Sequence, residues 1–187
     1  MNNTETTKLH LFLTRGLLAI AWAVVFVAAS HSLTVGAGVL LVVYPLIDVV
    51  GSLIDARGQQ GSARRLLLAG AAVSAVAAVA LGVAATGTVA NVLAVFGVWA
   101  LFSGAAQLVV ALRRRAQLGK QWPMRLAGGV STILGIAFII ASAGNAPKLS
   151  MLALYAAGGG VDFLLEAWLL ARRRRAGSRT PTVAAAS

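Results

Sequence analysis

The hydrophobic positions of this chain are gathered into six long runs, separated by short segments rich in turn-forming or charged residues. A helix needs about 20 residues to cross the roughly 30 Å hydrocarbon core of a bilayer, and each run is close to that length. We therefore predict an all-α integral membrane protein with six transmembrane helices, near residues 11–29, 33–54, 66–85, 89–112, 126–143 and 149–171.

Composition supports the same class. The 187 residues are 59% hydrophobic and 11% charged, whereas soluble domains average roughly 45–50% apolar and 25% charged residues. The absence of cysteine excludes disulfides, thiolate chemistry and cysteine-based metal sites.

The basic residues predict an orientation. Of 16 Lys and Arg residues, only Lys148 falls in a segment on the opposite side from the others. Since short loops rich in Lys and Arg stay in the cytoplasm, both termini are expected there. The predicted organisation is a short cytoplasmic N-terminus (1–10), a six-helix domain (11–171) and a basic, then disordered, cytoplasmic tail (172–187). The first span is expected to be retained, because its apolar run exceeds the roughly 7–15 residues of a cleaved leader.

A net charge of +11 would suit a nucleic-acid-binding protein. Here the charge follows the topology, with no aromatic interleaving and no recognisable binding module, so no nucleic-acid partner is expected. The expected partners are the lipid bilayer and anionic headgroups, the latter contacted by Arg172, Arg173, Arg174 and Arg175.

A helical hairpin repeats three times along the chain, at about 11–57, 65–115 and 125–172. Each first helix carries a basic residue near its start, and each second helix ends on arginine. Alignment on those arginines, with a slip of one residue in the first repeat, matches Asp48 with Ser103 and Asp162, and Ser52 with Gln107 and Glu166.

These six residues predict a polar layer inside the membrane. Members of each pair are four residues apart, so they project from one side of their helix. A carboxylate at membrane depth costs roughly 2.5–3.5 kcal/mol on insertion scales and usually pairs or carries a function. One interpretation is a structural clasp, with Arg15, Arg64 or Arg125 as counter-ions. The alternative is a proton-titrating or ion-conducting layer, in which two neighbouring carboxylates resist joint ionisation.

Small residues predict where helices approach closely. They recur every four residues in two spans, at Gly70, Ser74, Ala78 and Gly82, and at Ala127, Ser131 and Gly135. We expect these faces to pack against other helices of the bundle, and Gly135 to lie in close contact with one. A homo-oligomer contact is the alternative. Pro45 lies one turn before Asp48, so the carbonyl that it frees needs another donor.

The sequence resembles the HdeD-like acid-resistance membrane proteins, a family built from a short hairpin repeat. The resemblance rests on Arg-Leu-Ala-Gly-Gly-Val-Ser-Thr-Ile-Leu-Gly-Ile-Ala-Phe-Ile-Ile at 125–140 and on Phe-Gly-Val-Trp-Ala-Leu-Phe-Ser-Gly at 96–104. It implies a bacterial inner-membrane protein, linked in some members to survival of acid stress. The family provides no catalytic residues to transfer.

Three functional hypotheses follow. The first is a non-enzymatic protein of acid or envelope stress tolerance, the second a small proton-coupled transporter or channel that uses the acidic layer, and the third a structural or assembly subunit bound to another membrane protein. An enzyme is not expected, because the chain lacks a paired His and carboxylate at metal-ligand spacing, a Gly-x-Ser-x-Gly elbow and a phosphate-binding loop. No metal or other cofactor is indicated.

Overall fold

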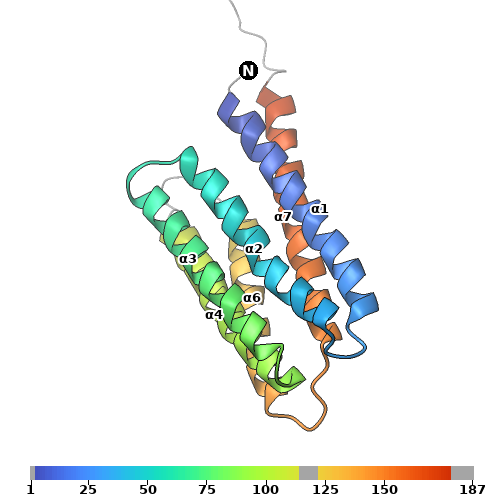
Figure 1. Cartoon of the computed structure of the whole chain (residues 1–187). Helices are drawn as coiled ribbons and strands as arrows, with labels where there is room; N and C mark the ends of the chain where they lie inside the picture. Colours follow the sequence, from blue (N-terminus) through green and yellow to red (C-terminus); the bar gives the residue numbers. More distant parts are fainter. Residues whose placement is uncertain (1–2, 114–121, 178–187) are drawn as a thin grey trace, which may run out of the picture.

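The computed structural model describes residues 3–113 and 122–177. These residues form six helices and the loops between them, and each helix has a stretch long and apolar enough to cross a membrane (Figure 1). The helices are α1 (Asn3–Ala29), α2 (Val35–Arg57), α3 (Gly61–Ala84), α4 (Val89–Arg113), α6 (Trp122–Ser142) and α7 (Ser150–Gly177). The predicted six-helix membrane fold is confirmed. Arg114, Arg115, Lys120 and most of the predicted tail (178–187) lie outside the described residues.

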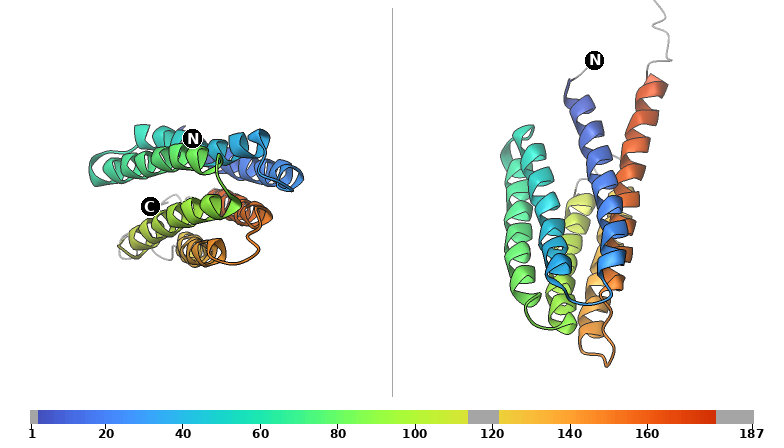
Figure 2. Two further views of the ribbon diagram at one scale, coloured as in Figure 1. Left: turned by 60° about the horizontal axis from the view of Figure 1, so that its bottom comes forward. Right: turned by 45° about the vertical axis from the view of Figure 1, so that its right-hand side comes forward.

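The helices form a closed ring. Each described helix packs against the ones before and after it, and α7 packs back against α1. Figure 2 shows the ring flattened into two layers, with α1, α2 and α3 in one and α4, α6 and α7 in the other. The closest pairs are α1 with α7, α2 with α3, and α4 with α6, while α6 and α7 touch least. The tight pairs therefore join helices of different predicted repeats.

Glycines bring two of these pairs together, α4 with α6 and α1 with α7, because side chains there would collide with a neighbouring backbone. A Cβ added to Gly104 would lie 2.7 Å from the carbonyl oxygen of Gly128, and one added to Gly135 would lie 2.7 Å from that of Gly97. In the α1–α7 pair, a Cβ at Gly16 would lie 3.0 Å from the carbonyl oxygen of Gly160. The close contact expected at Gly135 is confirmed, and its partner is α4.

The small-residue face of α3 packs over part of its predicted length. Ser74 and Ala78 are buried, and a Cβ at Gly82 would touch Val42 of α2 at 3.4 Å. A Cβ at Gly70 would meet nothing within 4 Å, so the prediction was wrong for this residue. Gly70 lies beyond the packed part of the helix face.

The half of the ring away from the termini has an apolar interior. Aromatic side chains fill it, with Trp22 stacked on Phe26 and Tyr155 edge-on to Phe96 at 5.1 Å between ring centroids. The outer surface is also apolar, since valines, isoleucines and leucines such as Val79, Ile140 and Leu154 are exposed. This is the distribution expected of a bundle surrounded by lipid.

Pro45 is buried inside α2, and a donor from α1 lies close to it. The indole N–H of Trp22 donates to the carbonyl of Leu40 at 2.7 Å. The carbonyl that Pro45 leaves without its helical donor is that of Leu41, one residue further on. The expected donor therefore lies next to this carbonyl rather than on it.

Candidate functional site

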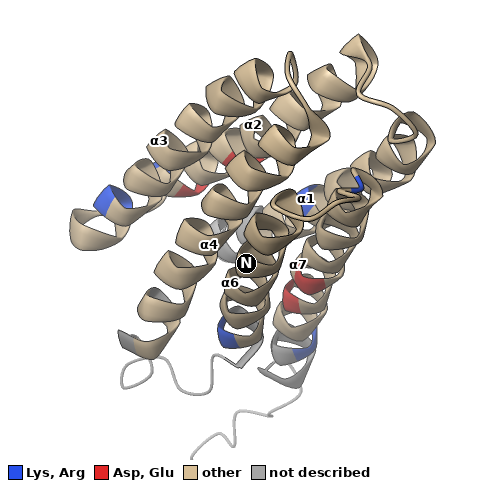
Figure 3. Ribbon diagram, turned by 90° about the horizontal axis from the view of Figure 1, so that it is seen from below, with Lys and Arg blue, Asp and Glu red and all other residues tan. Residues whose placement is uncertain are grey.

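Polar side chains gather in the half of the ring nearer the termini. Asp48 lies 13 residues into α2 and Asp162 lies 12 residues into α7. At 1.5 Å per residue, both are about 20 Å from the loop end of their helices. The sequence predicted this depth, and Figure 3 shows the acidic residues on α2 and α7.

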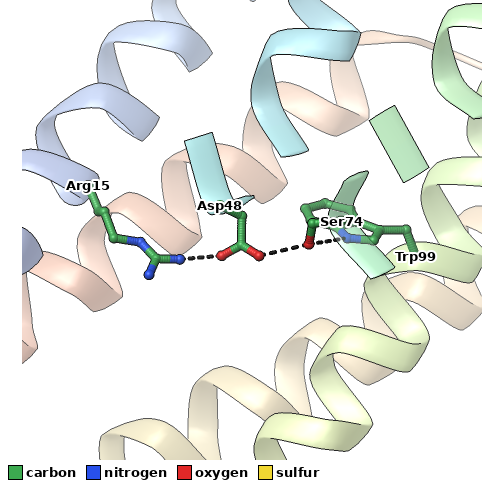
Figure 4. A network of polar contacts seen from close by, with 4 residues as sticks. All are labelled: Arg15, Asp48, Ser74 and Trp99. Atoms are coloured by element: carbon green, nitrogen blue, oxygen red, sulfur yellow. Dashed lines mark hydrogen bonds and ion pairs between the residues drawn. The ribbon is translucent and has the colours of Figure 1, made fainter. Parts of the chain in front are cut away.

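Asp48 is the centre of a network across four helices (Figure 4). Arg15 of α1 forms an ion pair with its Oδ1, and the Ser74 hydroxyl of α3 donates to its Oδ2 at 2.7 Å. The indole N–H of Trp99, on α4, donates to the Ser74 oxygen at 3.1 Å. The carboxylate is thereby held on both oxygens, as a charge inside a membrane protein requires.

Arg15 occupies a slot between α2 and α7. A Cβ added to Gly51 would lie 2.9 Å from three atoms of the Arg15 side chain, so glycine makes room for it. On the other side, the guanidinium carbon lies 4.5 Å from the centroid of the Phe163 ring, within cation–π range. Arg15 lies inside the apolar span Leu9–Ala29 rather than at the end of that span nearer the N-terminus.

A second network links two more contacts of the ring, α4 with α6 and α6 with α7. The Ser131 hydroxyl on α6 donates to the carbonyl of Ala100 on α4 at 3.1 Å and lies 2.6 Å from the Tyr155 hydroxyl on α7. Because a serine hydroxyl has one proton, Tyr155 is then the donor to Ser131. This network holds α6 and α7 together where their backbones touch least.

The remaining predicted members of the polar layer have fewer partners. Among the described residues, no ion pair or side-chain hydrogen bond holds Asp162, Glu166 or Gln107. Ser103 is half-buried on α4, and Ser52 is buried on α2. The structure thus brings Asp48, Gln107 and Asp162 to one cavity and leaves Ser52, Ser103 and Glu166 outside its lining.

The cavity has a volume of about 260 Å³ and lies inside the ring. Its polar lining is formed by Arg15, Tyr44, Asp48, Trp99, Gln107, Ser131, Tyr155 and Asp162. Gly158 and Gly159 of α7 line it too, and a Cβ at Gly158 would meet nothing within 4 Å. Gly158 therefore leaves space on the cavity side of α7, one turn before Asp162, while the helix continues unbroken through all three glycines.

The other predicted basic residues lie elsewhere. Arg64 and Arg125 are exposed, and within the described side chains neither forms an ion pair. Arg172 is exposed and lies over the ring of Trp168, 4.6 Å from its centroid. Arg173, Arg174 and Arg175 continue α7, but their side chains lie outside the described part.

Several residues of the site were not predicted as functional. Ser74 was predicted only as part of a helix-packing face, and Trp99 was noted only as part of the motif at 96–104 that resembles the family. Tyr155 was not singled out. A signal was present at Trp99, which lies in the middle of a span rather than at the lipid interface, where tryptophan is enriched. A buried indole N–H needs an acceptor, and here the acceptor is part of the site.

The charges of the cavity do not cancel. Arg15 and Asp48 neutralise each other as an ion pair, and Gln107, Tyr44 and Tyr155 are uncharged donors or acceptors. Asp162 is left as an acidic group without a basic partner among the described residues. The site is therefore suited to binding a proton or a cation.

Comparison with known proteins adds a family likeness. Residues 71–140, from α3 to α6, match the family described as a short repeat of unknown function, DUF308. This is the family to which HdeD-like proteins belong. No curated protein and no solved structure matched the chain.

Proposed function

We propose that this chain is a non-enzymatic proton-coupled carrier of the bacterial cytoplasmic membrane, with both termini in the cytoplasm, and that it contributes to acid or envelope stress tolerance. The observation that carries the proposal is Asp162, an acidic side chain without an ionic partner among the described residues, in a cavity inside a ring of membrane-spanning helices. Ionisable residues in such places usually lie on proton or substrate pathways.

The surroundings of Asp162 suit reversible protonation. The groups near it are Arg15 from α1, Asp48 and Tyr44 from α2, and Tyr155 and Glu166 from α7 itself. Gln107 of α4 and Ser131 of α6 face the cavity without charge. Since Arg15 is already paired with Asp48, a proton on Asp162 would be the simplest way to neutralise the cavity.

The arrangement also resembles that of carriers in which a site near the middle of the membrane is closed on one side. The aromatic core around Phe96 and Phe138 lies between the cavity and the loop end of the ring. Carriers of this kind alternate access around a fixed site by moving one helix group against another. The loosely packed α6–α7 contact provides a natural line for such movement.

The proposed orientation follows the basic residues of the described helices. Arg57, Arg64, Arg65, Arg125 and Arg172 lie at the helix ends nearest the termini, and Lys148 lies at the other end. A reporter fused after Arg175 should be cytoplasmic, and a cysteine introduced at Thr88 should label from outside. The opposite result for either would reject this topology.

Proton movement can be tested in proteoliposomes that contain a pH-sensitive dye and an imposed pH gradient. The wild-type chain should dissipate the gradient, and Asp162→Asn should abolish this activity. Asp55→Asn is the matched control, because Asp55 is an acid on α2 that does not line the cavity. Equal rates for wild type and Asp162→Asn would reject the proposal and favour a purely structural polar layer.

The physiological part needs a separate test. A deletion strain should survive acid challenge less well than its parent, and the wild-type chain should restore survival. Asp162→Asn together with Glu166→Gln should fail to restore it at equal protein level. Full complementation by the double variant would separate stress tolerance from the acidic layer.

A further inference from the structure

The cavity beside Asp162 has a lining chemistry that points to a particular class of ligand. Four aromatic side chains, Tyr44, Trp99, Tyr155 and Phe163, line it together with this carboxylate. Aromatic rings attract cations through their negative faces, and groups of them recognise ammonium ions that carry apolar substituents. A carboxylate among aromatic rings is therefore a typical site for an organic cation.

The structure already contains one cation bound in this way. The Arg15 guanidinium lies over the Phe163 ring at the edge of the cavity, 4.5 Å from its centroid. The Arg15 charge is used by Asp48, so it does not neutralise Asp162 through an ion pair. Tyr44, Trp99 and Tyr155 carry no positively charged partner within the described residues.

We propose that the cavity binds a small organic ammonium ion, with its charge next to Asp162 and its apolar groups against Tyr44, Trp99 and Tyr155. The volume of about 260 Å³ lies just below the roughly 300–1,000 Å³ of sites for drug-sized ligands, so the ligand is small. Any further polar group on the ligand would find the Gln107 amide and the hydroxyls of Ser131 and Tyr155 in the same lining.

This inference rests on the proposed function for one step only, the coupling to protons. A proton and an ammonium ion would compete for the same carboxylate, because either one neutralises Asp162. Release of the cation would then accompany proton uptake, and the chain would exchange the two across the membrane. Binding itself does not depend on that step and can be measured at equilibrium.

The test is calorimetric titration of the full chain in lipid nanodiscs with three probes of similar shape. Choline carries the ammonium charge, 3,3-dimethyl-1-butanol is its neutral isostere, and glycine betaine adds a carboxylate. Choline should bind, and the neutral isostere should bind at least about tenfold more weakly. Equal affinity for these two probes would overturn the proposal.

The betaine titration examines whether Arg15 is available. If the ion pair with Asp48 persists, betaine should bind more weakly than choline, because its carboxylate lies near Asp162 without a free basic partner. Tighter binding of betaine would mean that Arg15 leaves Asp48 to bind the ligand. The site would then be zwitterion-selective, and the cation proposal would be wrong.

Variants locate the site. Asp162→Asn should weaken choline binding by at least about tenfold, whereas Asp55→Asn should leave it unchanged. Tyr155→Phe keeps the ring and should keep most of the affinity, while Tyr155→Leu should lose it. Unchanged binding in Asp162→Asn or Tyr155→Leu would place the cation elsewhere. If Asp162→Asn does not fold, the three probes on the wild-type chain still decide the question.

The two proposals fail in different ways. If choline does not bind but Asp162→Asn still abolishes proton movement, the cation inference is wrong and the carrier proposal stands. If choline binds and Asp162→Asn leaves proton movement unchanged, the ligand class stands and proton coupling is wrong.

Discussion

Asp48 and Asp162 occupy equivalent positions in the first and third hairpin repeats, yet their surroundings are opposite. Asp48 accepts from Arg15 and Ser74 and is tied through Ser74 to Trp99. Asp162 faces the cavity, and none of the described residues forms an ion pair or side-chain hydrogen bond with it. Asp48 therefore joins helices, whereas Asp162 remains available to bind a proton or a cation.

The difference follows from ring closure and from a single arginine. Arg15 on α1 lies between α2 and α7, against Gly51 on one side and Phe163 on the other. It is therefore close to both acidic helices, but Asp48 is the one acid among the described residues with which it forms an ion pair. In the middle repeat the equivalent residue is Ser103, which is neutral. A threefold sequence pattern thus produces three different sites.

The largest effect on stability is expected when Asp48 loses its counter-ion, Arg15. Arg15→Met leaves the carboxylate without its positive partner and should lower the free energy of unfolding by about 2 kcal/mol. This is below the roughly 3–5 kcal/mol typical of breaking a fully buried pair, because the Asp48 side chain is 32% exposed. Thermal unfolding in detergent, followed by tryptophan fluorescence, measures the loss.

Two controls accompany this variant. Arg64→Met removes an exposed arginine and should change stability by less than about 0.5 kcal/mol. Arg15→Met with Asp48→Leu removes both charges and should recover much of the loss. A stability equal to wild type for Arg15→Met alone would show that the ion pair does not hold the ring together.

A second prediction compares the two acids directly. Asp48→Asn leaves Arg15 without its counter-charge and should cost about 1–2 kcal/mol. Asp162→Asn removes a charge that has no ionic partner among the described residues, so it should change stability by less than about 0.5 kcal/mol. The same unfolding assay ranks the two variants. Equal losses of stability in the two variants would contradict the view that Asp48 joins helices and Asp162 does not.

The fold could be predicted from the sequence to a large extent, because the length of an apolar run is itself the structural requirement for a transmembrane helix. The predicted run at 89–112 and the helix α4, Val89–Arg113, agree closely. The pairing of helices was not predicted. Contact between Gly16 and Gly160 links residues from the two ends of the chain, and spacing within one helix does not identify a partner on another.

The site was predicted only in outline. Depth in the membrane singled out Asp48 and Asp162, because the cost of a buried charge is a local property of the sequence. Arg15, rather than Arg64 or Arg125, is the counter-ion of Asp48 because of the way the helices are paired in the ring, and the sequence did not predict that pairing. The cavity was not predicted either, since an unfilled volume has no signature in a single sequence.

A smaller effect is expected from moving Arg15 without removing it. Gly51→Ala places a Cβ 2.9 Å from the Arg15 side chain, so the guanidinium must shift within its slot. We expect a net loss of about 0.5–1 kcal/mol, since alanine's better helix propensity offsets part of the strain. Gly70→Ala, where a Cβ meets open space, is the matched control and should be neutral or slightly stabilising. A gain in stability at Gly51 would show that Arg15 has another position of equal energy.

The smallest effect on stability is expected at Gly158, on the Asp162 side. A Cβ there meets nothing within 4 Å, so Gly158→Ala should change the free energy of unfolding by less than about 0.5 kcal/mol. Gly160→Ala, two residues along the same helix, would bring a Cβ to 3.0 Å from the carbonyl oxygen of Gly16 and should destabilise the α1–α7 pair. Because Gly158 lines the cavity, the same methyl group reduces the volume beside Asp162 and should weaken choline binding in the nanodisc titration. A loss of stability at Gly158 as large as that at Gly160 would mean that this face of α7 is packed against a neighbour, and that no open cavity lies beside Asp162.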